Sequence, residues 1–142
     1  MVVGLLQLRT NERIDSASKK LAARLALTEE FYKKKLGVYE DVDKQMIVIL
    51  GALNDLRLDP SSGERRAAVA DNLRKLNDMS TMNDLYLSKT IKDATSDVSY
   101  TAVGCLQAGS KPPTGMQSLQ NKVNQAEQLM KNELQGQLGS LD

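Results

Sequence analysis

The sequence predicts an all-α protein, an elongated helical hairpin or bundle with a Pro-Pro linker and a C-terminal coiled-coil-like helix. Two observations lead to this prediction. Aliphatic residues recur at steps of three and four over long stretches, which is the spacing of one apolar face on a helix. The 142 residues include only 3 prolines and 4% aromatic residues, while Leu, Ala, Gln, Lys, Arg and Glu, which favour helices, are frequent.

The first predicted helix covers residues 5–36, a stretch that contains neither Pro nor Gly. Gly37 follows a run of three lysines and is a natural C-cap, because glycine tolerates the left-handed conformation and cations favour the C-terminal end of a helix. A bend within a longer helix is the alternative, since residues 38–46 contain no helix breaker.

The second predicted helix covers residues 38–58, where aliphatic residues again step by four and three. The segment MIVIL widens this apolar stripe. By composition MIVIL also suits a buried strand, but the helical spacing on both sides favours a well-buried helix. The stepping residues are Val42, Met46, Ile49, Leu53 and Leu56, and the residues that widen the stripe are Ile47, Val48 and Leu50.

The clearest predicted turn follows this helix. Asp59-Pro60 ends the helix, since the residue before a proline disfavours the helical region. Ser61 and Glu64 lie three positions apart and predict a capping box that starts the third helix. A short turn between two long helices predicts an antiparallel hairpin. The third helix is soft at residues 77–84, where poor helix formers predict a kink or a split into two helices.

These predicted elements divide the chain into three regions. Residues 1–103 are predicted to form a bundle of three or four long helices. Residues 104–115 contain three Gly and two Pro and are predicted to be a linker, which the Pro-Pro pair makes semi-rigid. Residues 116–142 are predicted to form a C-terminal amphipathic helix that ends in a frayed, glycine-containing tail.

The C-terminal helix carries a narrow apolar seam, and an isolated helix of this length needs a partner to be stable in water. The seam either folds back onto the preceding helices or crosses to another subunit. The stiff linker and the narrow stripe favour the second arrangement, or a mixture of the two. We therefore predict a homo-oligomer with contacts from Met116, Leu119, Val123, Ala126 and Met130 and from Ile14, Leu21 and Leu25.

Residues that carry common catalytic or metal-binding chemistry are scarce. The sequence has no His, one Cys and no nucleotide-binding or nucleophile motif. Imidazole catalysis is therefore excluded, and a zinc site has no plausible ligand set. We expect Cys105 to be an unreactive thiol and the cluster of Glu40, Asp41 and Asp43 to be a solvated helical face. We expect no cofactor and no enzymatic activity.

The charges nearly balance, with 19 basic and 18 acidic residues, but they are unevenly distributed. Residues 1–36 carry eight basic and four acidic side chains, whereas residues 37–59 carry two basic and five acidic ones. Segments of opposite sign favour docking on each other or on a neighbouring copy. Lys33, Lys34 and Lys35, beside two aromatic residues, indicate a possible nucleic-acid contact, and pairing with nearby glutamates on the helix surface is the alternative.

The N-terminal sequence MVVGLLQLRTNER has a short apolar run, with no basic residue before it and no small-residue cleavage site. This run is far too short to predict a membrane span. We therefore expect a protein of the cytoplasm, or of a virion assembled in the cytoplasm, that is not secreted through a signal peptide.

The chain combines long helices rich in Ala, Leu, Gln and Lys, such as SASKKLAARLALTEEFYKKKL and QNKVNQAEQLMKNELQGQL, with an absence of His and Trp. In this texture it resembles the small helical, non-enzymatic virion proteins of tailed phages, such as internal core, ejection, connector or scaffold-like subunits. The resemblance implies a structural role in a virion, with the chain itself and other structural proteins as partners, and it transfers no residue roles.

Three functions follow from the sequence. The leading hypothesis is a structural or assembly subunit that packs helix to helix in a homo-oligomer or larger complex. The second is a nucleic-acid-associated protein that uses the basic N-terminal helix. The third is a helical adaptor or chaperone that holds a helix of another chain.

Overall fold

The structure is a computed structural model, and its described residues form α-helices, one short 3-10 helix and no strand, which confirms the all-α prediction. The described backbone covers residues 2–108 and 114–141, and the described side chains are those of residues 18–24, 26, 28–107 and 115–136. The elements are α1 (Val2–Leu58), α2 (Gly63–Met82), the 3-10 helix η1 (Asp84–Tyr86), α3 (Lys89–Ala108) and α4 (Thr114–Leu141).

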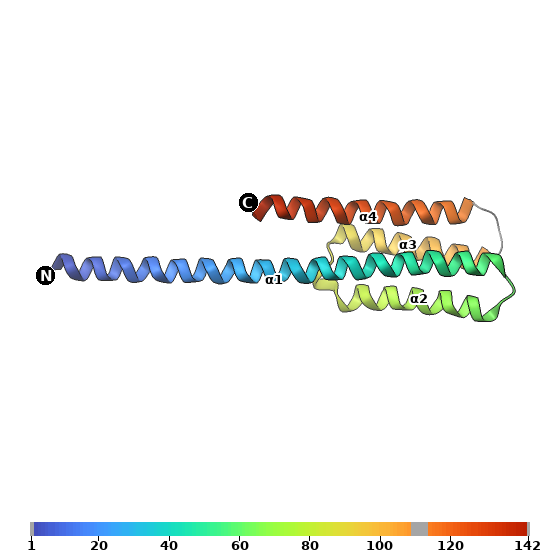
Figure 1. Cartoon of the computed structure of the whole chain (residues 1–142), viewed down its shortest axis with the longest axis horizontal. Coiled ribbons are helices and arrows are strands. Elements are labelled where there is room, and N and C mark those ends of the chain that lie inside the picture. Colours follow the sequence, from blue (N-terminus) through green and yellow to red (C-terminus); the bar gives the residue numbers. More distant parts are fainter. Residues whose placement is uncertain (1, 109–113, 142) are drawn as a thin grey trace. The chain divides into compact units, whose positions relative to one another are not determined.

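The chain forms two compact units, Met1–Lys34 and Lys35–Asp142. In the first unit, every described residue belongs to α1. In the second, the rest of α1 lies beside α2, α3 and α4, and the direction of the chain alternates from one helix to the next (Figure 1). The division therefore falls inside the first long helix and not at the predicted linker of residues 104–115.

One hydrophobic core holds the unit Lys35–Asp142 together. The predicted stripe of α1 is buried throughout, and each of the other three helices adds aliphatic residues at helical spacing. The buried residues include Val42, Met46, Ile49, Leu53 and Leu56 of α1, Val69, Leu73 and Leu76 of α2, Ile91, Val98 and Ala102 of α3, and Leu119, Val123, Ala126 and Met130 of α4.

Helix α1 continues through Gly37, so the predicted C-cap is wrong and the alternative of a longer helix is correct. A glycine inside a helix costs about 1 kcal/mol relative to alanine. Core packing outweighs this cost, because Tyr39 and Val42 are buried directly after the glycine. A local helix-ending signal thus loses to the tertiary contacts that follow it.

The prediction that MIVIL is helical is confirmed, but its breadth of burial was overestimated. Leu50 lies in the core, whereas Ile47 is 51% exposed and Val48 is 47% exposed. A helix in a four-helix unit presents only one side to its neighbours, so two β-branched residues remain on the outward side of α1.

The turn between α1 and α2 has the predicted position but a different cap. Ser62 is the N-cap of α2, and its Oγ accepts a hydrogen bond from the backbone N–H of Arg65 at 3.2 Å. The predicted capping box of Ser61 and Glu64 is wrong by one residue, because Ser61 instead donates to the Asp59 carboxylate at 3.1 Å.

The predicted third helix is divided into two helices near residues 77–84, which confirms the second of the two predicted alternatives. Helix α2 ends at Met82, η1 makes a short turn, and α3 begins at Lys89. The Ser88 hydroxyl caps the new helix by accepting a hydrogen bond from the N–H of Ile91 at 3.3 Å. Leu87, directly before this cap, is buried in the core.

The predicted linker and tail are shorter than expected. Helix α3 extends to Ala108 and α4 begins at Thr114, so most of the range 104–115 is helical. Pro112 and Pro113 lie outside the described residues. The tail predicted to fray is part of α4, which continues to Leu141.

The seam of α4 packs against its own chain. Leu119, Val123, Ala126 and Met130 are buried in the core of the unit Lys35–Asp142, and Met116 packs against it half-buried. The sequence favoured a partner for this seam from a second subunit, and the structure supplies an intrachain partner instead. The predicted linker did not indicate the partner of the seam correctly, because α3 and α4 include most of residues 104–115.

Candidate functional site: a buried carboxylate cluster and two surface grooves

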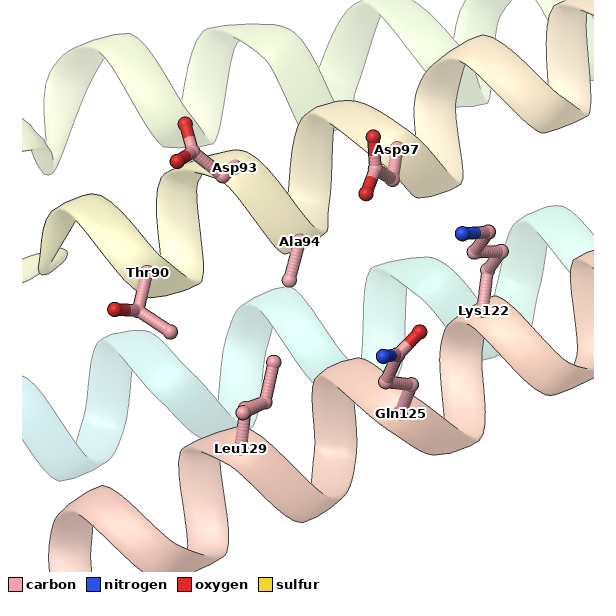
Figure 2. Close-up of a pocket in the computed structure, with 7 residues that line it drawn as sticks. All are labelled: Thr90, Asp93, Ala94, Asp97, Lys122, Gln125 and Leu129. Atoms are coloured by element: carbon pink, nitrogen blue, oxygen red, sulfur yellow. The ribbon is translucent and has the colours of Figure 1, made fainter.

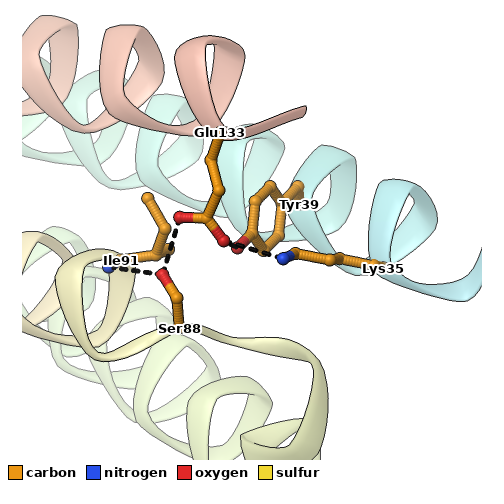
Figure 3. A network of polar contacts seen from close by, with 5 residues as sticks. All are labelled: Lys35, Tyr39, Ser88, Ile91 and Glu133. Carbon is orange, nitrogen blue, oxygen red and sulfur yellow. Dashed lines mark hydrogen bonds and ion pairs between the residues drawn. The ribbon is translucent and has the colours of Figure 1, made fainter. Parts of the chain in front are cut away.

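Glu133 of α4 is the centre of a polar cluster inside the helical unit (Figure 3). One carboxylate oxygen, Oε1, accepts a hydrogen bond from the Tyr39 hydroxyl at 2.6 Å and lies 2.7 Å from the Lys35 Nζ. The other, Oε2, accepts a hydrogen bond from the Ser88 hydroxyl at 2.7 Å. The cluster therefore joins α1, α4 and the residue that caps α3.

The cluster is largely removed from water. The Lys35 side chain is 7% exposed and the Glu133 side chain 22% exposed. Burial opposes ionisation of Glu133, but the hydrogen bonds from Lys35, Tyr39 and Ser88 and the charge of Lys35 outweigh it and lower the pKa of the carboxyl. The ammonium also lies 5.4 Å from the centre of the Tyr39 ring, in range of a cation–π contact.

These contacts weaken the Glu133 carboxylate as a base. A carboxylate with a lowered pKa that accepts three bonds from its own chain takes up a proton less readily than an ordinary carboxylate. Burial and the hydrogen bond to Glu133 raise the pKa of Tyr39, so its hydroxyl stays protonated and donating. Chemically, the arrangement fixes the positions of three helices.

Asp43 and Glu127 form a second carboxylate contact between α1 and α4. The Oδ1 atom of Asp43 is buried and has no hydrogen-bond partner among the described residues. Burial, and then a hydrogen bond that protonated Glu127 donates to the Asp43 carboxylate and the repulsion by that carboxylate, raise the pKa of Glu127. Asp43 is therefore not on a fully solvated face as predicted, although Glu40 and Asp41 are exposed. Within the described residues, no group of three His, Cys, Asp or Glu side chains is placed to hold a metal ion.

A groove lies between α1 and α2 on the surface of the unit, and we call it the α1–α2 groove. Its volume is about 370 Å³. Most of its lining is small or aliphatic, so it lacks the convergent polar groups of a small-molecule site. The lining residues are Val48, Gly51, Ala52 and Asp55 of α1 and Arg65, Ala68 and Asn72 of α2.

A second, smaller groove of about 180 Å³ lies between α3 and α4 (Figure 2). Asp93 and Asp97 line it from α3, and Lys122 and Gln125 line it from α4. Its charges are mixed and its walls are the exposed edges of two packed helices. No hydrogen bond or ion pair among the described residues joins these side chains into a site that would activate a nucleophile.

The three lysines predicted as a possible nucleic-acid contact differ in exposure. Lys33 and Lys34 are exposed, but Lys35 is buried and paired with Glu133. The inclusion of Lys35 is therefore wrong, since a buried ammonium with a carboxylate partner is not available to a phosphate. Successive residues of a helix point to different sides, so a run of three lysines does not form one contact surface.

The remaining predicted residues are only partly described. Leu21 is 60% exposed, and the side chains of Ile14 and Leu25 lie outside the described residues. Cys105 is half-buried and burial raises the pKa of its thiol, as expected for an unreactive cysteine.

Sequence reasoning missed the members of the Glu133 cluster, although a signal was present. The seam of α4 steps from Ala126 to Met130, and the next step of three reaches Glu133. The stripe of α1 extends backward from Val42 through Tyr39 to Lys35 in the same way. Opposite charges at core positions of two helices predict a buried pair, because a buried charge needs a partner.

Comparisons with protein-family models, with curated proteins and with solved structures found no match to this chain. No helix in the described part of the chain is both long enough and apolar enough to span a membrane.

Proposed function

We propose that the protein is a non-enzymatic structural or assembly subunit, which acts by packing helices against copies of itself or against other structural proteins. The resemblance to small helical virion proteins supports a virion as the setting of such an assembly. The polar cluster around Glu133 and the two grooves serve, in this proposal, to shape the subunit and not to transform a substrate.

The exposure of the α1 residues in the unit Met1–Lys34 carries the proposal. Every described side chain in residues 18–34 is exposed except that of Tyr32, which is half-buried. One of the exposed side chains, that of Leu21, is large and apolar, and it is 60% exposed. A helical segment that leaves its apolar side chains in water is marginally stable, because most helical stability in proteins comes from burial of an apolar face. A partner helix would supply that burial.

Hydrogen exchange tests the proposal on the full chain. Amides of residues 18–34 should exchange more slowly as protein concentration rises, because assembly buries and rigidifies this part of α1. Amides of α3, inside the helical unit, serve as the internal reference and should be equally protected at all concentrations. Slow exchange in residues 18–34 that does not depend on concentration would contradict self-assembly through this segment.

A matched pair of variants locates the contact. Leu21→Glu replaces an exposed leucine of the segment by a charged residue and should lower the solution mass measured by light scattering. Ser18→Glu adds the same charge at an exposed polar residue and should leave the mass unchanged. Neither site is buried within the chain, so neither substitution should reduce the stability of the subunit by more than about 0.5 kcal/mol.

Association with nucleic acid is the second candidate, and the exposed basic side chains of α1 favour it. Residues 18–34 carry five basic and two acidic side chains, and all seven are exposed. Binding of this kind falls steeply as salt increases. Replacing both Lys33 and Lys34 by Glu should abolish it, whereas replacing exposed Lys75 and Lys131 of the helical unit should not. Binding that is absent, or insensitive to salt, would exclude this function.

A further inference from the structure

The outward side of α1 in the helical unit carries a stripe of exposed residues, which we call the 44–55 stripe. It consists of Lys44, Val48, Gly51 and Asp55, flanked by Ile47, and all five are exposed. The steps of four, three and four between the first four place them on one side of the helix. Val48 and Ile47 give this side an unusually apolar centre for a surface helix.

The stripe is complementary to the same stripe of a second copy whose α1 runs in the opposite direction. Lys44 and Asp55 lie at equal distances on either side of the midpoint between Ile49 and Leu50, and so do Val48 and Gly51. In an antiparallel pair of helices centred on this midpoint, each Lys44 lies opposite Asp55 of the other copy. Each Val48 lies opposite the glycine, and the two Ile47 side chains lie along the same edge.

In the described part of the chain, the two charged side chains of the stripe, Lys44 and Asp55, take part in no ion pair. Arg65 donates to the backbone carbonyl of Asp55 at 2.6 Å and leaves its carboxylate unengaged. A Cβ added at Gly51 would meet no atom within 4 Å, so the space over this residue is open to a neighbouring helix.

We propose that the 44–55 stripe is the contact surface of a symmetric dimer, in which α1 of one copy packs antiparallel on α1 of a second copy. This inference rests on the proposed assembly function and names its partner and surface. The adjoining α1–α2 groove adds to the area that the second copy covers, because Val48, Gly51 and Asp55 line both features. A two-fold contact of this kind closes on itself and gives dimers and not filaments.

The size of the stripe predicts a weak and reversible dimer. Twelve helical residues span about 18 Å, which is short compared with the helix pairs of obligate dimers. The two ion pairs lie at the edge of the contact, so salt should weaken the dimer. Reversing one charge of each pair replaces two attractions by two repulsions and should weaken dimerisation about tenfold.

Charge exchange between two variants tests the proposal in the full chain. Lys44→Glu alone brings two carboxylates together at each end, and Asp55→Lys alone brings two ammonium groups together, so the dissociation constant of each variant should be about tenfold higher than that of the wild type. An equimolar mixture of the two restores both opposite-charge pairs and should form a heterodimer. Analytical ultracentrifugation over a range of concentrations gives the dissociation constants.

Gly51→Gln tests the apolar centre of the contact without changing charge. The new side chain occupies the open space opposite Val48 of the second copy and should prevent dimerisation. Gly104→Gln is the matched control, because Gly104 is also an exposed helical glycine with open space around it but lies on α3. Both variants should retain the helix content of the wild type.

The outcomes separate this inference from the proposed function. Restoration of the dimer only in the mixed sample, together with loss in Gly51→Gln, would establish the stripe. An oligomer whose mass is unaffected by all three substitutions would overturn the stripe and leave the assembly function standing. A wild-type chain that is monomeric at every concentration would overturn both self-association proposals.

Discussion

Replacing Glu133 by Gln tests whether the polar cluster stabilises the helical unit. The amide keeps a similar size, but its single carbonyl oxygen takes the place of only one of the two oxygens that accept from Tyr39 and Ser88, and it no longer neutralises Lys35. The Lys35 side chain is 7% exposed, so the substitution leaves a nearly buried ammonium without its charged partner. Removal of one member of a buried pair costs about 3–5 kcal/mol. Because Glu133 is 22% exposed and water can reach its position, we expect a loss of about 2–3 kcal/mol.

A double-mutant cycle isolates the pair from its surroundings. Lys35→Met keeps the aliphatic stem and removes the charge, and the double variant removes both charges. If the pair interacts directly, the double variant should be more stable than the sum of the single losses predicts, by about 1–2 kcal/mol. Urea unfolding followed by far-ultraviolet circular dichroism, at one fixed protein concentration, gives the three free-energy differences.

The dependence of stability on pH provides an independent check. The pKa of Glu133 is lowered in the folded chain, so its contribution is complete above the ordinary carboxyl pKa of about 4.3 and disappears as pH falls through the lower, folded value. The wild type should therefore approach the Glu133→Gln variant in stability below about pH 4. Strictly additive single effects, or a stability difference that persists unchanged at low pH, would refute this account of the cluster.

Three further predictions concern single positions. Tyr39→Phe should destabilise the unit by about 1–2 kcal/mol, because the hydrogen bond to Glu133 is lost. Since the pKa of Tyr39 is raised in the folded chain, the wild type should lose stability as pH rises above about 10, and the Phe variant should not show this loss. Unfolding curves at alkaline pH measure the difference. Gly37→Ala should raise the free energy of unfolding by about 0.5–1 kcal/mol, because the residue lies inside a helix with open space around it; a lower thermal midpoint would contradict this. Leu119→Asp should unfold the monomer, with loss of circular dichroism signal, because a charge in the core costs several kcal/mol; retained helix content would show that the α4 seam is not intrachain.

Helix content and most helix ends could be predicted from sequence, because the signals are local. The Asp59-Pro60 stop and the poor helix formers before Asp84 mark real breaks. The same local signals failed at Gly37 and at Gly104, where glycine marks no helix end. In the first case, buried residues on both sides hold the helix together, and no local pattern carries that information.

The partner of the α4 seam could not be predicted, because periodicity gives the buried side of a helix and not what covers it. The sequence indicated which residues of α4 would be buried, and Leu119, Val123 and Ala126 are buried as that pattern requires. Composition does not encode whether the covering helix belongs to the same chain. The exposure of Ile47 and Val48 could not be predicted for a related reason, because the hydrophobicity of a residue does not show which side of the helix faces solvent.

The polar cluster resolves an ambiguity that the apolar seams leave open. Seams built from residues at steps of three and four look alike after a shift of seven residues, so apolar packing alone selects the sides of α1 and α4 more strongly than their register. A shift of seven residues would separate Glu133 from both Lys35 and Ser88 and leave a charge unpaired in the interior. The cluster thus destabilises the shifted arrangements far more than it stabilises the native one. Specification of helix register in this way is the role best attested for buried polar groups. The double variant Lys35→Met, Glu133→Gln tests this role. Loss of a single register would broaden the amide signals in its NMR spectrum, even where its stability is restored.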